Sequence, residues 1–141
     1  MDHVAILNPP RVLDKILRGE KTIESRWYKA RYAPWGRIRQ GERVFFKVAG
    51  KPVTAVATVR KVLEFEIAPD PLLAVLDKYG KDIAFDWSLD KVYVWALEKK
   101  YGILVFLEQA YKLNPFDVSK KGFGNACAWM CVESIDDIRK T

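Results

Sequence analysis

The chain has 141 residues, of which 50% are hydrophobic and 30% are charged. This length and composition fit one globular domain with its own core and argue against a disordered chain. Lys and Arg number 24 against 18 Asp and Glu, which gives a formal net charge of +6. A basic balance suits a polyanionic partner, although an ordinary solvated surface would show the same charge.

The cysteine and histidine content argues against two kinds of site. Cys127, Cys131 and His3 are too few for a disulfide-stapled secreted domain or for a zinc site of four Cys and His ligands. The first residues lack the pattern of a signal peptide, and no apolar run is long enough to cross a membrane. We therefore expect a cytoplasmic protein with no membrane contact, no metal and no cofactor.

The first part of the chain predicts a strand, a helix and a second strand. Residues 4–7 form a short apolar run, and residues 10–18 have helical spacing that ends at Gly19, where a helix C-cap belongs. Residues 21–28 then alternate with a period of two. This places Glu24 and Arg26 on one face of the strand, and Ile23 and Trp27 on the face that we expect in the core.

The rest of the chain predicts a hairpin, helices and further strands. Residues 44–48 and 53–62 resemble a hairpin, and helices are expected after Asp70 and Ser88. Strands follow at 103–107 and 126–132, separated by a loop at 112–124, with a last helical turn up to Arg139. Because strands and helices do not alternate, this order favours an α+β fold: a β-barrel of mostly antiparallel strands with peripheral helices.

One segment carries a recognisable motif. Residues 19–26 fit the pattern G-x-K-x-x-E-x-R, directly after the first helix and before the hairpin. In this the chain resembles the ASCH domain family of the PUA-like superfamily. The resemblance implies a single ASCH/PUA-like domain over residues 1–141, a PUA-like β-barrel with a cleft beside the motif, and binding of RNA. The characteristic positions of the family correspond to Gly19, Lys21, Glu24 and Arg26.

The chemistry of these residues points to the same kind of ligand. Lys21 offers a point charge for a phosphate, and Arg26 offers a planar fork for a phosphate or a base edge. Glu24 could hold that fork, accept a hydrogen bond from a base amino group, or act as a general base. A surface Glu–Arg pair of little energetic value is the structural alternative. Strict alternation would put Lys21 on the opposite face, unless it lies in the turn before the strand or at a bulge.

Aromatic and cationic residues add candidate contacts for RNA or a nucleotide-like ligand. Residues 27–39 mix rings with positive charges, and from them Tyr28, Arg31 and Trp35 are predicted to stack on bases and to contact phosphates. Core packing is the alternative for Trp35. Lys120 and Lys121 lie in a glycine-containing loop and are predicted as second-rank contacts.

Three functions remain open from the sequence. The leading hypothesis is an RNA-binding module that uses a basic, aromatic-lined cleft around the motif. The alternative is an enzyme in the same cleft, a ribonuclease or an amidohydrolase-like enzyme on a modified nucleoside, with Lys21 and Glu24 catalytic. Some PUA-like amidohydrolases use a Lys and a Thr of this motif, but Glu24 stands at the Thr position here and Thr22 lies two residues early. Glu64 and Glu66 are the candidate bases. The third hypothesis is a protein-interaction module.

Overall fold

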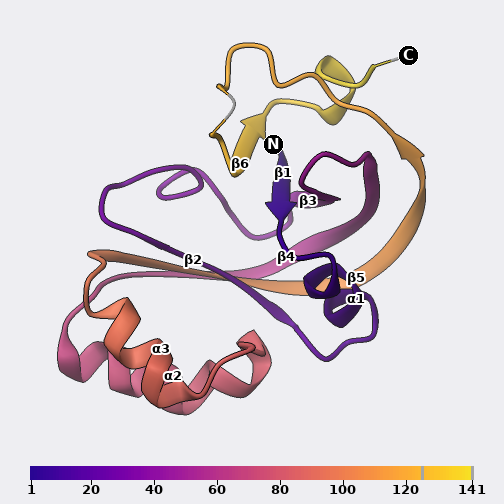
Figure 1. Cartoon of the computed structure of the whole chain (residues 1–141). Helices are drawn as coiled ribbons and strands as arrows, with labels where there is room; N and C mark the ends of the chain where they lie inside the picture. Colours follow the sequence, from indigo (N-terminus) through magenta and orange to yellow (C-terminus); the bar gives the residue numbers. More distant parts are fainter. Residues whose placement is uncertain (125, 141) are drawn as a thin grey trace.

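The computed structural model describes residues 1–124 and 126–140 of the chain (Figure 1). Along these residues the elements are, in order, β1 (Asp2–Leu7), α1 (Arg11–Leu17), β2 (Ile23–Tyr28), β3 (Arg43–Val48), β4 (Val53–Glu66), α2 (Pro69–Ile83), α3 (Leu89–Ala96), β5 (Tyr101–Phe116), β6 (Trp129–Val132) and a 3-10 turn (Ile135–Asp137).

The strands form a six-stranded sheet in the order β2-β5-β4-β3-β1-β6. Neighbouring strands are antiparallel except β1 and β3, which are parallel. The long β4 and β5 run through its centre, and their register shifts at three points, which lets the ladder bend. The result is a curled sheet that forms a half-barrel. The predicted α+β fold with mostly antiparallel strands and peripheral helices is confirmed.

The helices cover different parts of this sheet. Figure 1 shows α2 and α3 together on one side of the molecule, away from α1. Leu72 of α2 and Val92 of α3 are fully buried and pack in one cluster with Ile23 and Trp27 of β2. Burying each such side chain stabilises the fold by roughly 1.5–3 kcal/mol. None of the described helices is long and apolar enough to cross a membrane.

The turn from α1 into β2 positions the motif. The amide of Gly19 donates to Ile16 O and that of Glu20 donates to Lys15 O, which is the hydrogen-bond pattern of a Schellman motif. Gly19 has a φ of 77°, a left-handed conformation that a side chain would strain. The predicted C-cap is therefore present, and it turns the chain so that Lys21 arrives immediately before β2.

Two predicted boundaries near the C-terminus are wrong. Residues 112–116 were expected in a loop, but they continue β5, which pairs there with β4 alone because β2 begins only at Ile23, opposite Phe106. A strand with a free edge tolerates Pro115, whose turn signal suggested the loop. The last strand begins at Trp129 rather than at residue 126.

Candidate functional site

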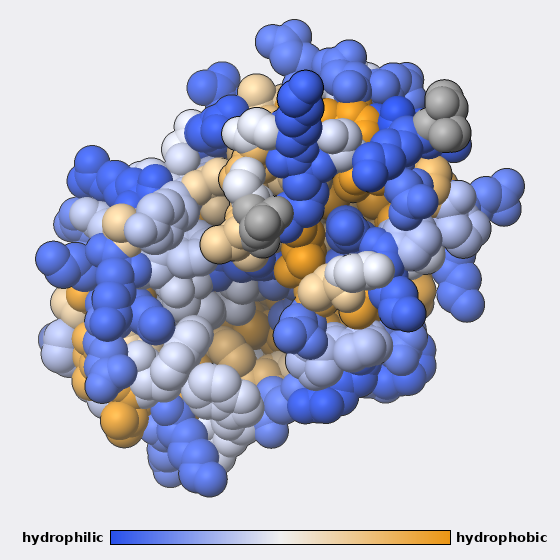
Figure 2. Space-filling view, turned by 45° about the horizontal axis from the view of Figure 1, so that its top comes forward, coloured by the Kyte–Doolittle hydropathy of each residue, from blue (hydrophilic) through white to orange (hydrophobic). Residues whose placement is uncertain are grey.

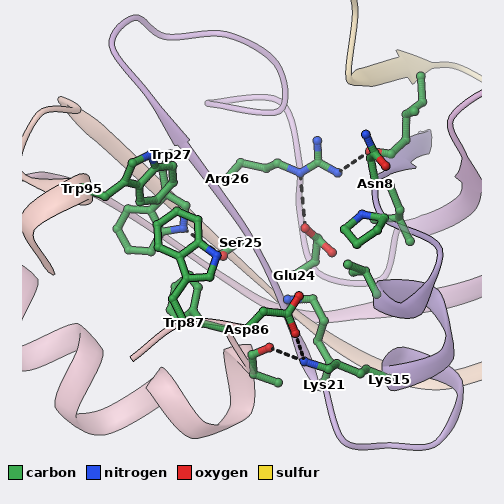
Figure 3. Close-up of a pocket in the computed structure, with 16 residues that line it drawn as sticks. Asn8, Lys15, Lys21, Glu24, Ser25, Arg26, Trp27, Asp86, Trp87 and Trp95 are labelled. Carbon is green, nitrogen blue, oxygen red and sulfur yellow. Dashed lines mark hydrogen bonds and ion pairs between the residues drawn. The ribbon is translucent and has the colours of Figure 1, made fainter. Parts of the chain in front are cut away.

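A cleft of about 400 Å³ opens between β2, the end of β1 and the segment that joins α2 to α3. We call it the motif cleft (Figure 3), since three motif residues, Lys21, Glu24 and Arg26, line it together. The end of β1 and helix α1 contribute Ile6–Pro9, Val12 and Lys15 to its lining, and the opposite side consists of Ser25, Trp27, Ala84–Trp87 and Trp95.

Lys21 reaches the cleft because it lies in the turn before β2, which begins at Ile23, and so is free of the strand's alternation. Lys21 is only 8% exposed, and its Nζ donates to the carbonyl of Ile83 at 2.7 Å. Burial lowers the pKa of Lys21, an effect that the charge of Glu24 opposes and that of Arg26 adds to. The buried amine of Lys21 therefore loses its proton at a lower pH than the amine of a surface lysine does.

Glu24 and Arg26 are adjacent and nearly buried. Arg26 Nε lies 3.4 Å from Glu24 Oε1, and the two side chains are 11% and 7% exposed. Glu24 Oε2 and Arg26 Nε are both buried, and neither has a hydrogen-bond partner among the described residues. The pair is thus not the solvated surface ion pair that the sequence left open as the alternative.

The guanidinium of Arg26 is largely held by the protein itself. Its Nη1 donates to the carbonyl of Ala128 and its Nη2 to that of Ile6, both at 3.2 Å. It also lies over the ring of Trp129, 5.1 Å from the ring centroid. Arg26 therefore connects β2 to β1 and to the start of β6, and only part of its donor set can face a ligand.

A buried series of hydrogen bonds holds Trp129, the ring that Arg26 contacts. The indole Nε1 of Trp129 donates to His3 Nδ1 at 3.0 Å, so His3 carries its proton on Nε2 and donates it to Glu42 Oε1 at 2.8 Å. Burial lowers the pKa of His3, and the hydrogen bond to Glu42 opposes that effect. Local sequence patterns could not assign His3 a role, since its partners lie 39 and 126 residues away.

Aromatic rings form the wall opposite β1. The ring centroids of Trp27 and Trp95 are 6.3 Å apart, those of Trp27 and Phe85 are 6.2 Å apart, and those of Trp87 and Trp95 are 5.1 Å apart. Figure 3 shows Trp27, Trp87 and Trp95 gathered on one side of the cleft. Trp87 is 46% exposed and presents apolar surface to solvent. Trp27 is buried, as predicted, and also lines the cleft.

An ionic contact holds this wall to α1. Lys15 Nζ lies 2.6 Å from Asp86 Oδ1 and donates to Ala84 O at 3.1 Å, while Arg11 Nε donates to Asp86 Oδ2 at 3.0 Å. The hydrogen bond from Lys15 lowers the pKa of Asp86, and that from Arg11 adds to the effect. Asp86 thereby ties the segment between α2 and α3 to the helix on the far side of the cleft (Figure 3).

Three predicted ligand contacts lie outside the motif cleft as defined by its lining residues. Trp35 packs against Tyr101 at a centroid distance of 4.9 Å, and the guanidinium of Arg31 lies over the same ring at 5.3 Å. Tyr28 packs against Tyr32 at 5.6 Å. These residues form an aromatic cluster of their own, so the structure does not bring them together with Lys21.

The remaining candidates lie around the cleft rather than in it. Gly19 and Thr22 line a neighbouring hollow that shares Lys21 with the motif cleft. Lys120 Nζ donates to Cys127 O at 3.1 Å, next to the carbonyl that holds Arg26, and Lys121 is exposed.

The carboxylates considered as bases are engaged elsewhere. Glu64 accepts from the amide of Gly36 at 2.6 Å, and Glu66 lies 3.9 Å from Arg31. Neither lines the motif cleft.

The fold and the cleft define the class of this protein: a small α+β half-barrel with a charged, aromatic-walled cleft beside β2. Among solved structures, a point mutant of the ASCH protein from Zymomonas mobilis matches with a TM-score of 0.70 and 16% identity, covering 96% of this chain and 93% of that one. Another structure of ASCH from the same organism gives a TM-score of 0.68 at 16% identity, covering 94% and 87%. The N-terminal domain of Staphylothermus marinus McrB matches with a TM-score of 0.59 and 16% identity, covering 96% and 90%.

These comparisons place the chain in the ASCH fold, and the resemblance drawn from the motif is confirmed at that level. No protein-family model matches the sequence, and no curated protein matches it either.

Proposed function

We propose that this protein is an RNA-binding module that takes up a single unpaired base in the motif cleft. The observation that carries the proposal is the cleft itself, in which the buried groups of Lys21 and Glu24 face a wall that includes the half-exposed Trp87. A volume of about 400 Å³ suits one base with its ribose and not a folded duplex. A ring such as Trp87 can stack on a base, and buried polar groups can contact its edge.

Positive charge around the cleft supports a polyanionic ligand. The chain carries a net charge of +6, and hydrophilic side chains cover much of the face in Figure 2, with apolar ones visible between them. Arg11 is exposed at the α1 side of the cleft, and Lys120 and Lys121 lie near the Arg26 side. The ASCH resemblance, which implies RNA binding, agrees with this distribution.

The test is a titration of labelled single-stranded RNA, with binding and strand integrity measured in the same samples. About three phosphate contacts should weaken binding roughly twentyfold between about 50 and about 200 mM salt. Trp87→Ala should lower affinity about tenfold, because stacking contributes about 1–3 kcal/mol per base. Lys21→Met should also weaken binding. Arg26 is left intact in this test, since it holds the sheet.

Matched variants elsewhere on the surface serve as controls. Tyr111→Ala removes an exposed ring, and Lys112→Met removes an exposed charge, on the part of β5 that does not line the cleft. Both variants should bind RNA with the affinity of the wild type, once the affinity of Lys112→Met has been corrected for the loss of one positive charge. The proposal would be contradicted by an RNA affinity that does not change with salt concentration. An affinity that falls equally in Trp87→Ala and Tyr111→Ala would contradict it too.

An enzyme in the same cleft is the second candidate. It is favoured by one observation: Lys21 is buried, its pKa is lowered, and it shares the cleft with the carboxylate of Glu24. An amine of lowered pKa next to a carboxylate can move protons during cleavage of RNA or of a modified nucleoside. Strand cleavage that disappears in Lys21→Met and in Glu24→Gln would establish this function. Turnover that survives both substitutions would exclude these residues as the catalytic pair.

A further inference from the structure

The second oxygen of the Glu24 carboxylate is the one side-chain acceptor in the motif cleft that is buried and has no hydrogen-bond partner among the described residues. Oε1 is paired with Arg26 Nε, whereas Oε2 has no hydrogen-bond partner among those residues. A buried acceptor without a partner costs about 1–3 kcal/mol, and more when it is charged. The cleft is wide enough for a ligand to supply the missing donor.

A donor lies on the neighbouring side chain. The ammonium group of Lys21 has three N–H donors, and one of them is directed at Ile83 O. The others remain for a ligand in the same cleft, which Lys21 and Glu24 both line. Figure 3 shows these two side chains adjacent, on the side of the cleft opposite the tryptophans. The protein thus presents one acceptor beside one donor, across from a stacking surface.

From this arrangement we propose that Glu24 selects the base, and that the cleft accepts a base whose Watson–Crick edge carries an exocyclic amino group beside a ring nitrogen acceptor. Cytosine and adenine have such an edge, with an amino donor next to N3 or N1. The amino group donates to Glu24 Oε2, and the ring nitrogen accepts from Lys21. This inference rests on the proposed function and adds the class of base to it.

Uracil does not fit the same pair of groups. Its only N–H on this edge lies between two carbonyl oxygens. If the Glu24 carboxylate accepts from that N–H, the lone pairs of both carbonyl oxygens lie close to the carboxylate and repel it. One of these carbonyls can accept from Lys21, but the other faces the carboxylate without a donor. A site whose polar groups are left unmatched rejects the wrong ligand strongly. We expect uracil to bind at least tenfold more weakly.

The experiment uses uridine oligonucleotides that differ at one central position. That position is uridine, cytidine, adenosine or N4,N4-dimethylcytidine, which has lost both amino hydrogens. Wild-type protein should bind the cytidine and adenosine oligonucleotides about tenfold more tightly than the uridine one, and the dimethylated one no better than uridine. Glu24→Gln, which has the same shape, should bind the uridine, cytidine and adenosine oligonucleotides within about twofold of one another, because its amide can accept from an amino group or donate to a carbonyl.

The control variant is Glu20→Gln, which removes an exposed carboxylate four residues before Glu24 and should keep the wild-type preference. Equal affinity of wild-type protein for cytidine and uridine, with salt-sensitive and Trp87-dependent binding, would overturn the inference and leave the proposed function intact. Loss of affinity in Glu24→Gln that leaves the preference unchanged would overturn it too, since Glu24 would then act only by supporting Arg26. No binding of any oligonucleotide would refute the proposed function itself.

Discussion

Replacing Gly102 by alanine should destabilise the fold at the wall of the motif cleft. Gly102 of β5 pairs with Trp27 of β2 on one side and with Phe65 of β4 on the other. A Cβ atom on Gly102 would lie 2.6 Å from Phe65 Cε1 and 3.1 Å from Trp27 Cζ3. The two rings meet edge to face with centroids 5.8 Å apart, so neither can withdraw without breaking that contact.

Overpacking of this kind costs about 1–3 kcal/mol. For a chain of this length the melting temperature should fall by about 3–9 °C. Urea unfolding followed by circular dichroism gives the free energy directly. Gly80→Ala is the control: its Cβ would meet only the end of the Leu89 side chain, which is 43% exposed and can move. Alanine at this position, in the last turn of α2, should be neutral or stabilising by up to about 1 kcal/mol. A Gly102→Ala protein as stable as the wild type would refute the packing argument.

Three further predictions concern titrating groups. Because burial lowers the pKa of His3 below 6.5, the unfolded chain binds its proton first, so the free energy of unfolding should fall as the pH drops below about 6.5 and down to the lowered pKa. Urea unfolding at several pH values should show this loss in the wild type and not in His3→Gln. Burial raises the pKa of Cys131 to about 11, so in a Cys127→Ser protein the remaining thiol should resist Ellman's reagent at pH 8 and react once unfolded. Asp86→Asn should reduce stability by less than about 1 kcal/mol in urea unfolding, because its ion pairs are partly exposed.

Local patterns were enough to predict β2, α1 and the motif. The period of two along residues 23–28 separated Ile23 and Trp27 from Glu24 and Arg26. In the structure Ile23 and Trp27 pack in the core as predicted, although Trp27 also lines the cleft. Gly19 ended the helix because the left-handed cap is a local requirement. These features depend on residues within one turn or one strand, so a sequence shows them without knowledge of the fold.

The aromatic wall could not be predicted in the same way. Trp95 lies on α3, and Phe85–Trp87 lie in the segment between α2 and α3. They reach the cleft only because α2 and α3 pack against β2. Conversely, Trp35 and Arg31 are close to the motif in sequence but turn toward Tyr101. The signal that was overlooked is the density of rings between two predicted helices.

The contacts of Arg26 have a consequence for the shape of the whole sheet. In the strand order, β2 is one edge and β6 is the other, and no backbone ladder joins them. Arg26 spans this opening, from β2 to the carbonyls of Ile6 and Ala128. A single side chain thus takes the place of the seam that would close a full barrel. The two carbonyls are held by two separate nitrogens of one planar fork, whereas a lysine would offer a single nitrogen to both.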